Sequence, residues 1–311
     1  MIPFYSYKNG NYDVTIFSDG TKVRYNYEDS LVPDFPENID FKISSYCDIG
    51  CPYCHEGANK KDMLLKRSKI NELVKSPFFK SLHRGMELAL GGGALSKINL
   101  TNFDYLLRKL NTDKKVFPNI TINAKELDNK EFTEFVIKHM NVNIYGVGIS
   151  YNPEYKNKIL DFVRRAQSEN IVIHTICGVT QKEDYDWLAK YGFKVLILGY
   201  KSFRRGNDYL KTHNDEILQN QKELSDNLEY YSKYFKTLSF DCLALEQLNI
   251  KERVSPEVWS KNYMGDDGRF TMYIDLPNMK YAKNSTAPLS ERKDLSLSMT
   301  IEDIFKSLWT E

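Results

Sequence analysis

Six strand-like segments alternate with six helix-like segments between residues 41 and 236, and this rhythm constrains the fold more than any other feature. Regular alternation at about 30 residues per unit predicts parallel strands joined by right-handed crossovers. The fold class is therefore α/β, with either an open doubly wound sheet or a partial (β/α)6 TIM-like barrel. The expected strands are 41–46, 86–90, 119–124, 144–151, 171–177 and 194–200, and the expected helices are 66–75, 102–110, 130–139, 155–169, 182–191 and 213–235.

The two ends of the chain do not follow this rhythm. Alternating runs at Tyr12–Phe17 and Lys22–Tyr27, joined through Asp-Gly, predict a β hairpin. Beyond the last unit, we expect a seventh strand at Leu238–Leu243, a second hairpin within Phe270–Ala282 and a helix that begins at Thr300. These patterns divide the chain into an N-terminal β hairpin extension (1–40), a partial barrel (41–236) and a C-terminal β/α extension that closes the barrel (237–311).

Charge and hydropathy exclude several classes of partner. The chain has 43 basic and 42 acidic residues, so its net charge of +1 gives no electrostatic case for nucleic acid or for an anionic membrane. No apolar stretch approaches the roughly 18 residues that a membrane span needs. Residues 1–11 lack the apolar core of a signal peptide, so we expect a cytoplasmic protein.

Three of the five cysteines lie within eight residues, in the spacing C-x3-C-x2-C, directly after the first barrel strand. Thiolates this close on one loop can converge on one iron–sulfur cluster. A [4Fe–4S] cluster is usually held by four cysteines, so three would leave one iron open to a small molecule. Gly50 and Pro52 suit the tight loop that this requires. The expected ligands are Cys47, Cys51 and Cys54.

Two other readings of the cysteines remain open. Zinc is often held by three cysteines and one histidine, and His55 would be the fourth ligand. Against this, His55 directly follows Cys54, and a second ligand pair farther along the chain is missing. A redox pair made by Cys51 and Cys54 is the other alternative, but it does not need Cys47. A metal-stabilised binding module without enzymatic activity therefore stays an alternative to an enzyme.

The cysteine spacing, placed at the start of a βα series, resembles the radical SAM enzymes over residues 41–240. In that family the open iron binds S-adenosylmethionine (SAM), and one electron from the cluster cleaves SAM to methionine and a 5′-deoxyadenosyl radical. The radical then abstracts hydrogen from a substrate. The resemblance implies a partial (β/α)6 barrel, a [4Fe–4S] cluster, SAM as the second cofactor, and flavodoxin or ferredoxin as the electron donor.

The resemblance also implies which residues contact SAM. Tyr53 resembles the aromatic residue that contacts adenine. The three glycines after the second strand stand where the family has Gly-Gly-Glu, so Gly93 replaces a carboxylate. Asn123 and Ser150 resemble polar residues near the ribose and the SAM carboxylate, although hydrogen bonding at a strand end would explain them equally well. The expected SAM contacts are Tyr53, Gly91, Gly92, Gly93, Asn123 and Ser150.

Further polar residues follow the barrel strands. Lys201, Arg204 and Arg205 come after the sixth strand, where they would hold an anionic group of the substrate or cofactor, or else form a solvated basic loop. His55 and Glu56 lie beside the cysteines and are candidates for proton transfer.

Substrate specificity is expected to lie in the two extensions. Peptide-modifying relatives often carry extra cluster cysteines in the C-terminal region, and this chain has none there. We nevertheless take a peptide or protein side chain as the first substrate class and a small molecule as the second. An activase that installs a glycyl radical on a partner protein shares the cysteine motif, but such activases are usually shorter or carry a ferredoxin-like insert.

Overall fold

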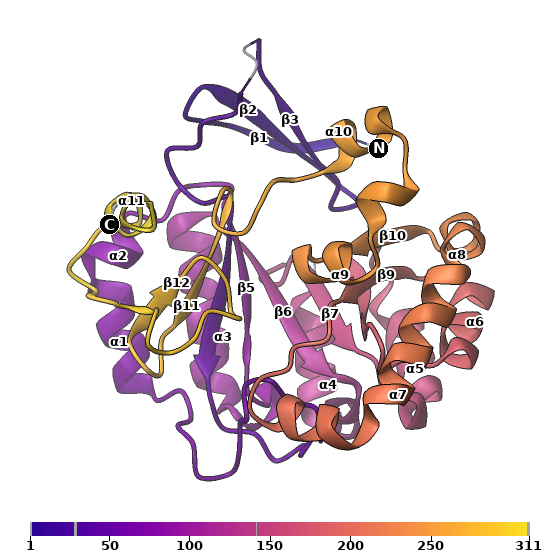
Figure 1. Ribbon diagram of the computed structural model, residues 1–311. Helices are drawn as coiled ribbons and strands as arrows, with labels where there is room; N and C mark the ends of the chain where they lie inside the picture. The colour runs from indigo at the N-terminus through magenta and orange to yellow at the C-terminus, as the bar shows by residue number, and fades with distance from the viewer. Residues whose placement is uncertain (1, 28–29, 141, 310–311) are drawn as a thin grey trace.

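The computed structural model describes residues 2–27, 30–140 and 142–309 (Figure 1). The six predicted strand–helix units are all present, and their boundaries lie within a few residues of the prediction except in the last helix. The strands are β4 (Asn38–Ser44), β5 (Glu87–Gly92), β6 (Phe117–Asn123), β7 (Gly146–Ser150), β8 (Ile171–Ile176) and β9 (Lys194–Leu198), and the helices are α1 (Arg67–Lys75), α3 (Leu100–Arg108), α4 (Lys130–His139), α5 (Lys156–Ala166), α6 (Lys182–Lys190) and α7 (Arg205–Asp226).

These strands form the centre of a ten-stranded sheet with the order β10-β9-β8-β7-β6-β5-β4-β11-β12-β13. The strictly sequential order from β4 to β9 matches the partial barrel and not the doubly wound alternative, in which the order reverses part-way. In the described residues β10 and β13 are the two edges, so the barrel does not close. The flanking strands are β10 (Thr237–Phe240) and β11 (Thr271–Asp275), which are parallel to their neighbours β9 and β4, and β12 (Lys280–Ala282) and β13 (Lys293–Asp294), which are antiparallel.

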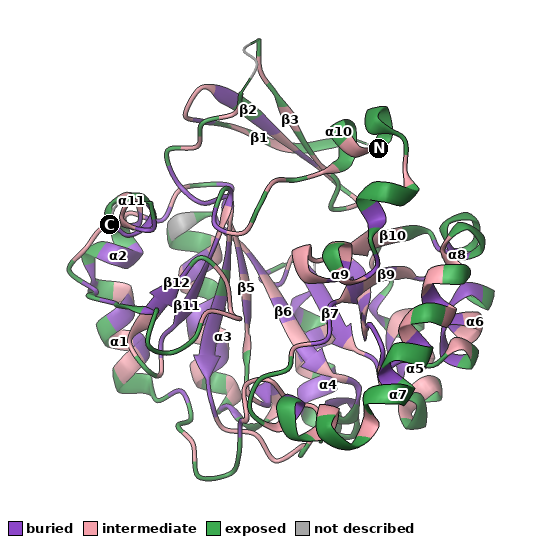
Figure 2. Ribbon diagram, in the orientation of Figure 1, coloured by how far each residue is buried: buried purple, intermediate pink, exposed green. Residues whose placement is uncertain are grey.

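The two faces of the sheet differ in burial. In β6 and β8 every second residue is buried, and the residues between them are only partly covered (Figure 2). The buried set, such as Ile120 and Ile173, packs in the main core against helix residues such as Phe132 and Phe162. Because side chains alternate along a strand, the partly covered set lines the inside of the curved sheet.

A separate three-stranded sheet covers the amino ends of the barrel strands (Figure 1). Its hairpin was predicted, but the first strand, which pairs with the hairpin, was not. The Lys22 ammonium lies 2.6 Å from Glu87 at the start of β5, and Arg24 lies 2.6 Å from Glu37 just before β4. Buried ion pairs thus attach this sheet to the barrel. Its strands are β1 (Pro3–Asn9), β2 (Tyr12–Phe17) and β3 (Lys22–Tyr25).

Helix α7 differs from the prediction at both ends. It begins at Arg205 rather than at His213, where the backbone is kinked. Gly206 weakens the helical signal of the first turn, but a side chain there would meet the Lys201 carbonyl oxygen at 2.3 Å. The helix ends at Asp226, and the rest of the expected segment forms α8 (Leu228–Tyr234).

The C-terminal region contains the predicted seventh strand, which is shorter than expected. β10 stops at Phe240 because the Asp241 side chain accepts the backbone N–H of Ala244 at 2.8 Å and caps a helix that starts at Cys242. Thr300 caps the last helix, as predicted. In the described residues, no helix is both long and apolar enough to cross a membrane. The remaining elements are α2 (Pro77–Lys80), α9 (Cys242–Gln247), α10 (Pro256–Asn262), α11 (Ile301–Ser307) and the short turns η1 (Leu95–Lys97), η2 (Lys109–Lys114), η3 (Ala124–Asp128), η4 (Pro153–Tyr155) and η5 (Ile250–Arg253).

Candidate functional site

The three clustered cysteines lie on the loop that leaves the carboxyl end of β4. Cys47, Cys51 and Cys54 are free thiols, and all three are partly exposed. The backbone N–H of Cys54 donates to the Cys51 carbonyl oxygen at 3.3 Å, which turns the chain sharply between them. Gly50 has a φ of +78°, a left-handed conformation that favours glycine.

The cysteine loop is bonded to a second loop that runs on from it to α1. The backbone N–H of Cys47 donates to the Asn59 carbonyl oxygen at 3.1 Å. The N–H groups of Ser45 and Tyr46 both donate to the Met63 carbonyl oxygen, at 3.0 and 3.1 Å. The cysteine loop is therefore held in place by backbone contacts.

Arg205, the first residue of α7, clamps the cysteine loop from the other side. Its Nε donates to the Cys51 carbonyl oxygen and its Nη1 to the Ala58 carbonyl oxygen, each at 3.0 Å. Its Nη2 is buried without a hydrogen-bond partner in the described residues. A buried guanidinium donor without a partner is costly, so this atom marks a place where an anionic group would be stabilised.

The glycines after the second barrel strand lie against the backbone that leads into Cys47. The N–H of Gly93 donates to the Ser44 carbonyl oxygen at 2.8 Å. A Cβ on Gly93 would stand 1.9 Å from the Tyr46 carbonyl oxygen, and one on Gly92 would stand 2.3 Å from that of Ser44. A carboxylate side chain therefore has no room at position 93, which explains the departure from Gly-Gly-Glu.

Asn123, at the end of β6, is brought to the cysteines. Its amide nitrogen lies 3.8 Å from the Cys51 sulfur. Glu126, which the sequence analysis missed, fixes this position: its carboxylate accepts the N–H of Asn123 at 2.8 Å and that of Ser96 at 2.7 Å. Burial raises the pKa of Glu126. The pattern Asn-x-x-Glu is a capping-box signal that would have found it.

Ser150 lies one strand farther along at the same level. It pairs in register with Asn123 on one side and with His174 on the other. The His174 ring covers Gly148, where a Cβ would stand 2.3 Å from the ring. Burial lowers the pKa of His174 to about 4, so the ring is neutral near pH 7. The expected cofactor residues of β6 and β7 thus share one level of the barrel.

Tyr53 lies between the cysteines and α7. Its ring meets that of Tyr209 edge-on, with centroids 5.8 Å apart, and Tyr209 stacks on His213 at 3.8 Å. Burial raises the pKa of Tyr53 to about 12. Tyr209 and His213 were not singled out from the sequence, because only the fold of α7 brings them here.

Comparison with known proteins bears on the fold alone. No protein-family model and no curated protein sequence matches the chain. Among solved structures it matches native anSMEcpe with bound AdoMet, at a TM-score of 0.55 and 13% identity over 88% of this chain and 81% of that one. The chain therefore shares the fold of this AdoMet-bound protein. It also matches coproporphyrinogen III oxidase (HemN) from Escherichia coli, a radical SAM enzyme, at a TM-score of 0.44 and 13% identity over 64% of this chain, and it spans about half (52%) of HemN.

In this fold, the donor set fits an iron–sulfur cluster. Three soft thiols share one loop, and the Asn123 amide and the Arg205 guanidinium adjoin Cys51. Burial raises the pKa of the Cys51 thiol to about 11, and a bound cation such as iron would favour its ionised form. Within the residues that the structure describes, no three His, Cys, Asp or Glu side chains are gathered as one metal ion needs.

A buried charge network joins the cysteine loop to β11 and to the segment that follows β12. The Lys42 ammonium lies 2.6 Å from Glu56 and 3.3 Å from Asp275, the last residue of β11. Arg292 lies 3.2 Å from the same Asp275 carboxylate, and the Tyr273 hydroxyl donates to Glu56 at 3.3 Å. These contacts join Glu56 to the C-terminal region, and the sequence analysis did not predict them.

Proposed function

We propose that this protein is a radical SAM enzyme in which Cys47, Cys51 and Cys54 hold a [4Fe–4S] cluster and leave one iron open to SAM. Such a cluster, when bound, supplies the electron that cleaves SAM to methionine and a 5′-deoxyadenosyl radical, which abstracts hydrogen from a substrate. One observation carries the proposal: the C-x3-C-x2-C loop leaves the carboxyl end of the first strand of a fold that matches an AdoMet-bound protein.

The chain's own residues have distinct roles in this proposal. The Asn123 amide at 3.8 Å from the Cys51 sulfur donates toward thiolate charge. Gly92 and Gly93 let backbone approach the loop where a side chain would collide, and we assign this turn to the methionine end of SAM. We assign Ser150, at the same strand level as Asn123, to the ribose or carboxylate of SAM. We assign Tyr53 to the adenine.

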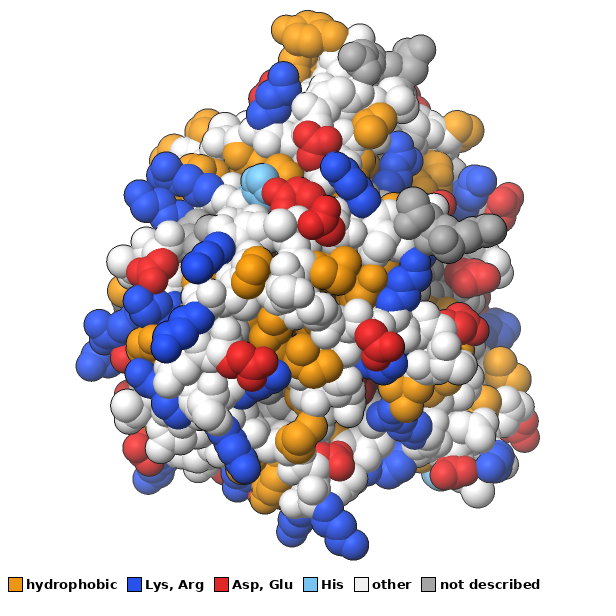
Figure 3. All heavy atoms as spheres, turned by 90° about the vertical axis from the view of Figure 1, so that its left-hand side faces the viewer, with side chains coloured by type: hydrophobic (Ala, Val, Ile, Leu, Met, Phe, Trp, Pro, Cys, Tyr) orange, Lys and Arg blue, Asp and Glu red, His pale blue; other side chains and the backbone are white. Residues whose placement is uncertain are grey.

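The electron donor, flavodoxin or ferredoxin in this proposal, needs a surface near the cysteines. Lys60, Lys61 and Lys66 are exposed on the loop after the cysteines and enter no ion pair within the described residues, and Met63 beside them is also exposed. Backbone hydrogen bonds tie this loop to the residues that lead into Cys47. Figure 3 shows Lys and Arg side chains spread over one side of the molecule down to its lower edge, with Asp and Glu between them. An acidic electron carrier suits such a surface.

Iron analysis and SAM cleavage test the proposed function. Protein reconstituted without oxygen should contain about four irons per chain and release 5′-deoxyadenosine from SAM with dithionite. Replacing Cys47, Cys51 or Cys54 with Ala should abolish both, whereas the control Cys242→Ala, in α9, should preserve both. One zinc per chain with no SAM cleavage would instead support a metal-stabilised binding module.

The donor surface is tested separately. The triple variant K60E/K61E/K66E should lose most SAM cleavage supported by flavodoxin or ferredoxin and keep the cleavage supported by dithionite, a small reductant. The control variant K8E/K130E/K138E reverses three exposed lysines on other elements and should keep both. Equal losses in the two triple variants would contradict docking at this loop.

A further inference from the structure

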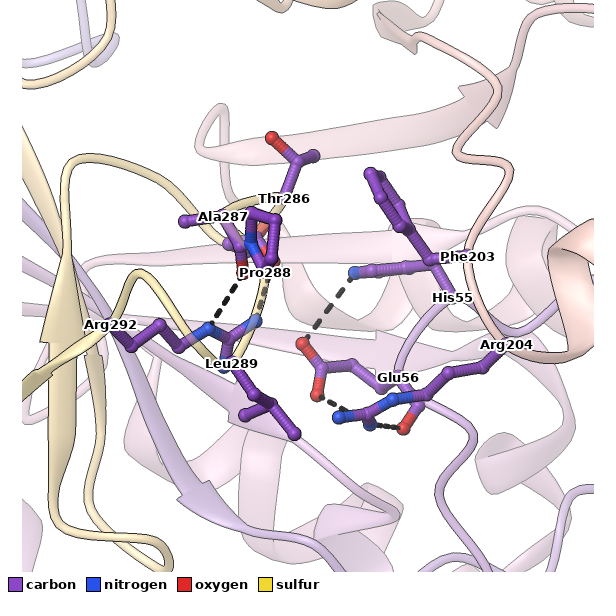
Figure 4. A pocket seen from close by; sticks show the side chains of 10 residues that line it. His55, Glu56, Phe203, Arg204, Thr286, Ala287, Pro288, Leu289 and Arg292 are labelled. Atoms are coloured by element: carbon purple, nitrogen blue, oxygen red, sulfur yellow. Dashed lines mark hydrogen bonds and ion pairs between the residues drawn. The ribbon is translucent and has the colours of Figure 1, made fainter.

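A cavity of about 200 Å³ lies beside the cysteine loop (Figure 4). Its walls come from three segments: residues 55–56 after β4, residues 203–204 after β9, and residues 285–292 of the C-terminal region. None of the residues at the exits of β5, β6 or β7 lines it. The cavity is therefore separate from the residues assigned to SAM, and its size suits one side chain or a small acid.

Positive charge exceeds negative charge around this cavity. Lys42 and Arg292 are matched by Glu56 and Asp275 in the buried network. The Arg204 guanidinium stands 3.8 Å from Glu56, a carboxylate that Lys42 already binds at 2.6 Å.

Lys201 is a second cation near the cavity. Its Nζ donates to the Ser285 hydroxyl at 3.3 Å, and it enters no ion pair in the described part of the chain. Asp40 lies on the inner face of β4. Burial raises the pKa of Asp40, and the Lys201 charge lowers that pKa by less. The two side chains do not form an ion pair. Among the residues that line the cavity, two cations, Arg204 and Arg292, accompany one carboxylate, Glu56, and Lys201 contacts the lining residue Ser285.

The position of Arg204 is built into the loop. Its φ of +51° is left-handed, which is strained for a residue with a Cβ. Gly57 makes room for it, since a Cβ there would stand 2.9 Å from the Arg204 side chain. Arg292 holds the facing wall by donating to the carbonyl oxygens of Ala287 and Ser285, each at 2.9 Å. Both sides of the cavity are therefore fixed.

We propose that this cavity binds a carboxylate carried on a short apolar stem, with Lys201 and Arg204 as its cationic partners. Arg204 offers planar paired donors and Lys201 a compact charge. Phe203, Pro288 and Leu289 supply apolar contact for the stem. An acidic side chain of a peptide and a free dicarboxylic acid share this chemistry. The inference rests on the proposed function, because it makes the cavity the place where substrate meets the cysteine loop.

Calorimetric titration of reconstituted protein with saturating SAM tests the inference. The acidic probes are glutarate and the blocked peptide acetyl-Ala-Glu-Ala-amide, and the neutral probes are glutaramide and acetyl-Ala-Gln-Ala-amide. At least one acidic probe should bind about tenfold more tightly than its neutral counterpart. Binding of the peptide alone would assign a peptide side chain as substrate, and binding of glutarate alone a small acid. Absence of any acidic preference, or displacement of the acid by SAM, would overturn the inference.

Variants identify the cations responsible. K201Q and R204Q should each weaken acid binding about tenfold, and K201R should restore most of it. The control K233Q removes an exposed lysine of α8 that pairs with Glu229 at 2.7 Å, and it should change nothing. Unchanged binding in both K201Q and R204Q would contradict the inference. Dithionite-driven SAM cleavage, measured on the same samples, separates the two proposals. If the wild type does not cleave SAM, the proposed function is contradicted, whereas the inference about the cavity is tested by acid binding alone.

Discussion

The two ends of the barrel strands are built from different contacts. At the amino ends, Lys22 is bound by Glu87 and Glu37, and Arg24 and Tyr12 both bind Glu37, at 2.6 and 2.7 Å. At the carboxyl ends, three free thiols share one loop. Buried polar atoms without a hydrogen bond occur at both ends of the described structure: Arg205 Nη2 at the carboxyl end, and Glu37 Oε2 and Asn119 Oδ1 among those at the amino end. The difference therefore lies in the chemistry of the groups: paired charges join two sheets at one end, and free thiols that can hold a metal lie at the other.

The largest expected effect sharpens the comparison at the carboxyl end. Gly93→Ala places a Cβ 1.9 Å from the Tyr46 carbonyl oxygen and should lower the free energy of unfolding by about 4 kcal/mol and abolish iron binding. The matched control is Gly91→Ala, whose Cβ would meet only Thr121 at 3.8 Å and should cost less than about 0.5 kcal/mol. Urea unfolding of both variants is the measurement. Equal stability of the two variants would contradict the close backbone approach.

Glu37→Gln probes the amino end. The side chain is buried, and although burial raises its pKa, Lys22 and Arg24 outweigh burial and lower it. Removing the charge should cost about 2 kcal/mol of unfolding free energy while leaving iron binding intact.

The same residue gives a pH test. Because its folded pKa lies below the unfolded value, Glu37 stabilises the fold above about pH 4.5, and this contribution is lost as the pH falls further. Urea unfolding between pH 6 and 3 should show a steeper loss of stability in the wild type than in Glu37→Gln. Parallel pH curves would show that the amino end is not held by these charges.

Arg205→Gln tests the clamp on the cysteine loop against an equivalent clamp elsewhere. Arg253 also donates to two carbonyl oxygens, those of Leu248 at 3.0 Å and Ser225 at 3.3 Å. Both Arg→Gln variants should lose about 1 kcal/mol of stability. Only Arg205→Gln should lose iron several-fold faster to a chelator. Equal rates of iron loss in the two variants would show that Arg205 stabilises the fold without a specific role at the cysteine loop.

His174 lies inside the barrel between the two ends and gives a second pH test. Burial lowers its pKa to about 4, so the neutral ring is favoured in the folded state. Stability should therefore fall as the pH drops from about 6.5 toward 4, as unfolded histidine takes up its proton. NMR titration should give a midpoint near 4. A midpoint near 6.5 would mean that water reaches the ring freely.

The sequence predicted what depends on local pattern. The strand–helix units, the β2–β3 hairpin and the position of the cysteines all follow from periodicity and spacing. It missed β1, whose pairing with β2 is a tertiary contact, and the start of α7, where Gly206 masks the helical pattern. The Lys42–Asp275 ion pair joins residues far apart in the chain, and no local pattern indicates such a partner.

Within the candidate site, the sequence predicted which residues belong to the site but not which residues they contact. The sequence shows that Gly93 departs from Gly-Gly-Glu. Only the structure shows that the Tyr46 carbonyl oxygen lies where a Cβ at this position would stand. Arg205 was predicted either to hold an anion or to belong to a solvated basic loop, and its two bonds to the cysteine loop were not predicted. Glu126 carried a readable capping signal that was passed over.

The most direct test of the central claim is the EPR spectrum of the reduced, reconstituted protein with and without SAM. If Cys47, Cys51 and Cys54 leave one iron open at the carboxyl ends of the barrel strands, SAM should change the cluster signal. A ¹⁷O label in the SAM carboxylate should then produce a hyperfine coupling. A cluster signal that SAM leaves unchanged and uncoupled would show that no iron is open, and it would contradict the account.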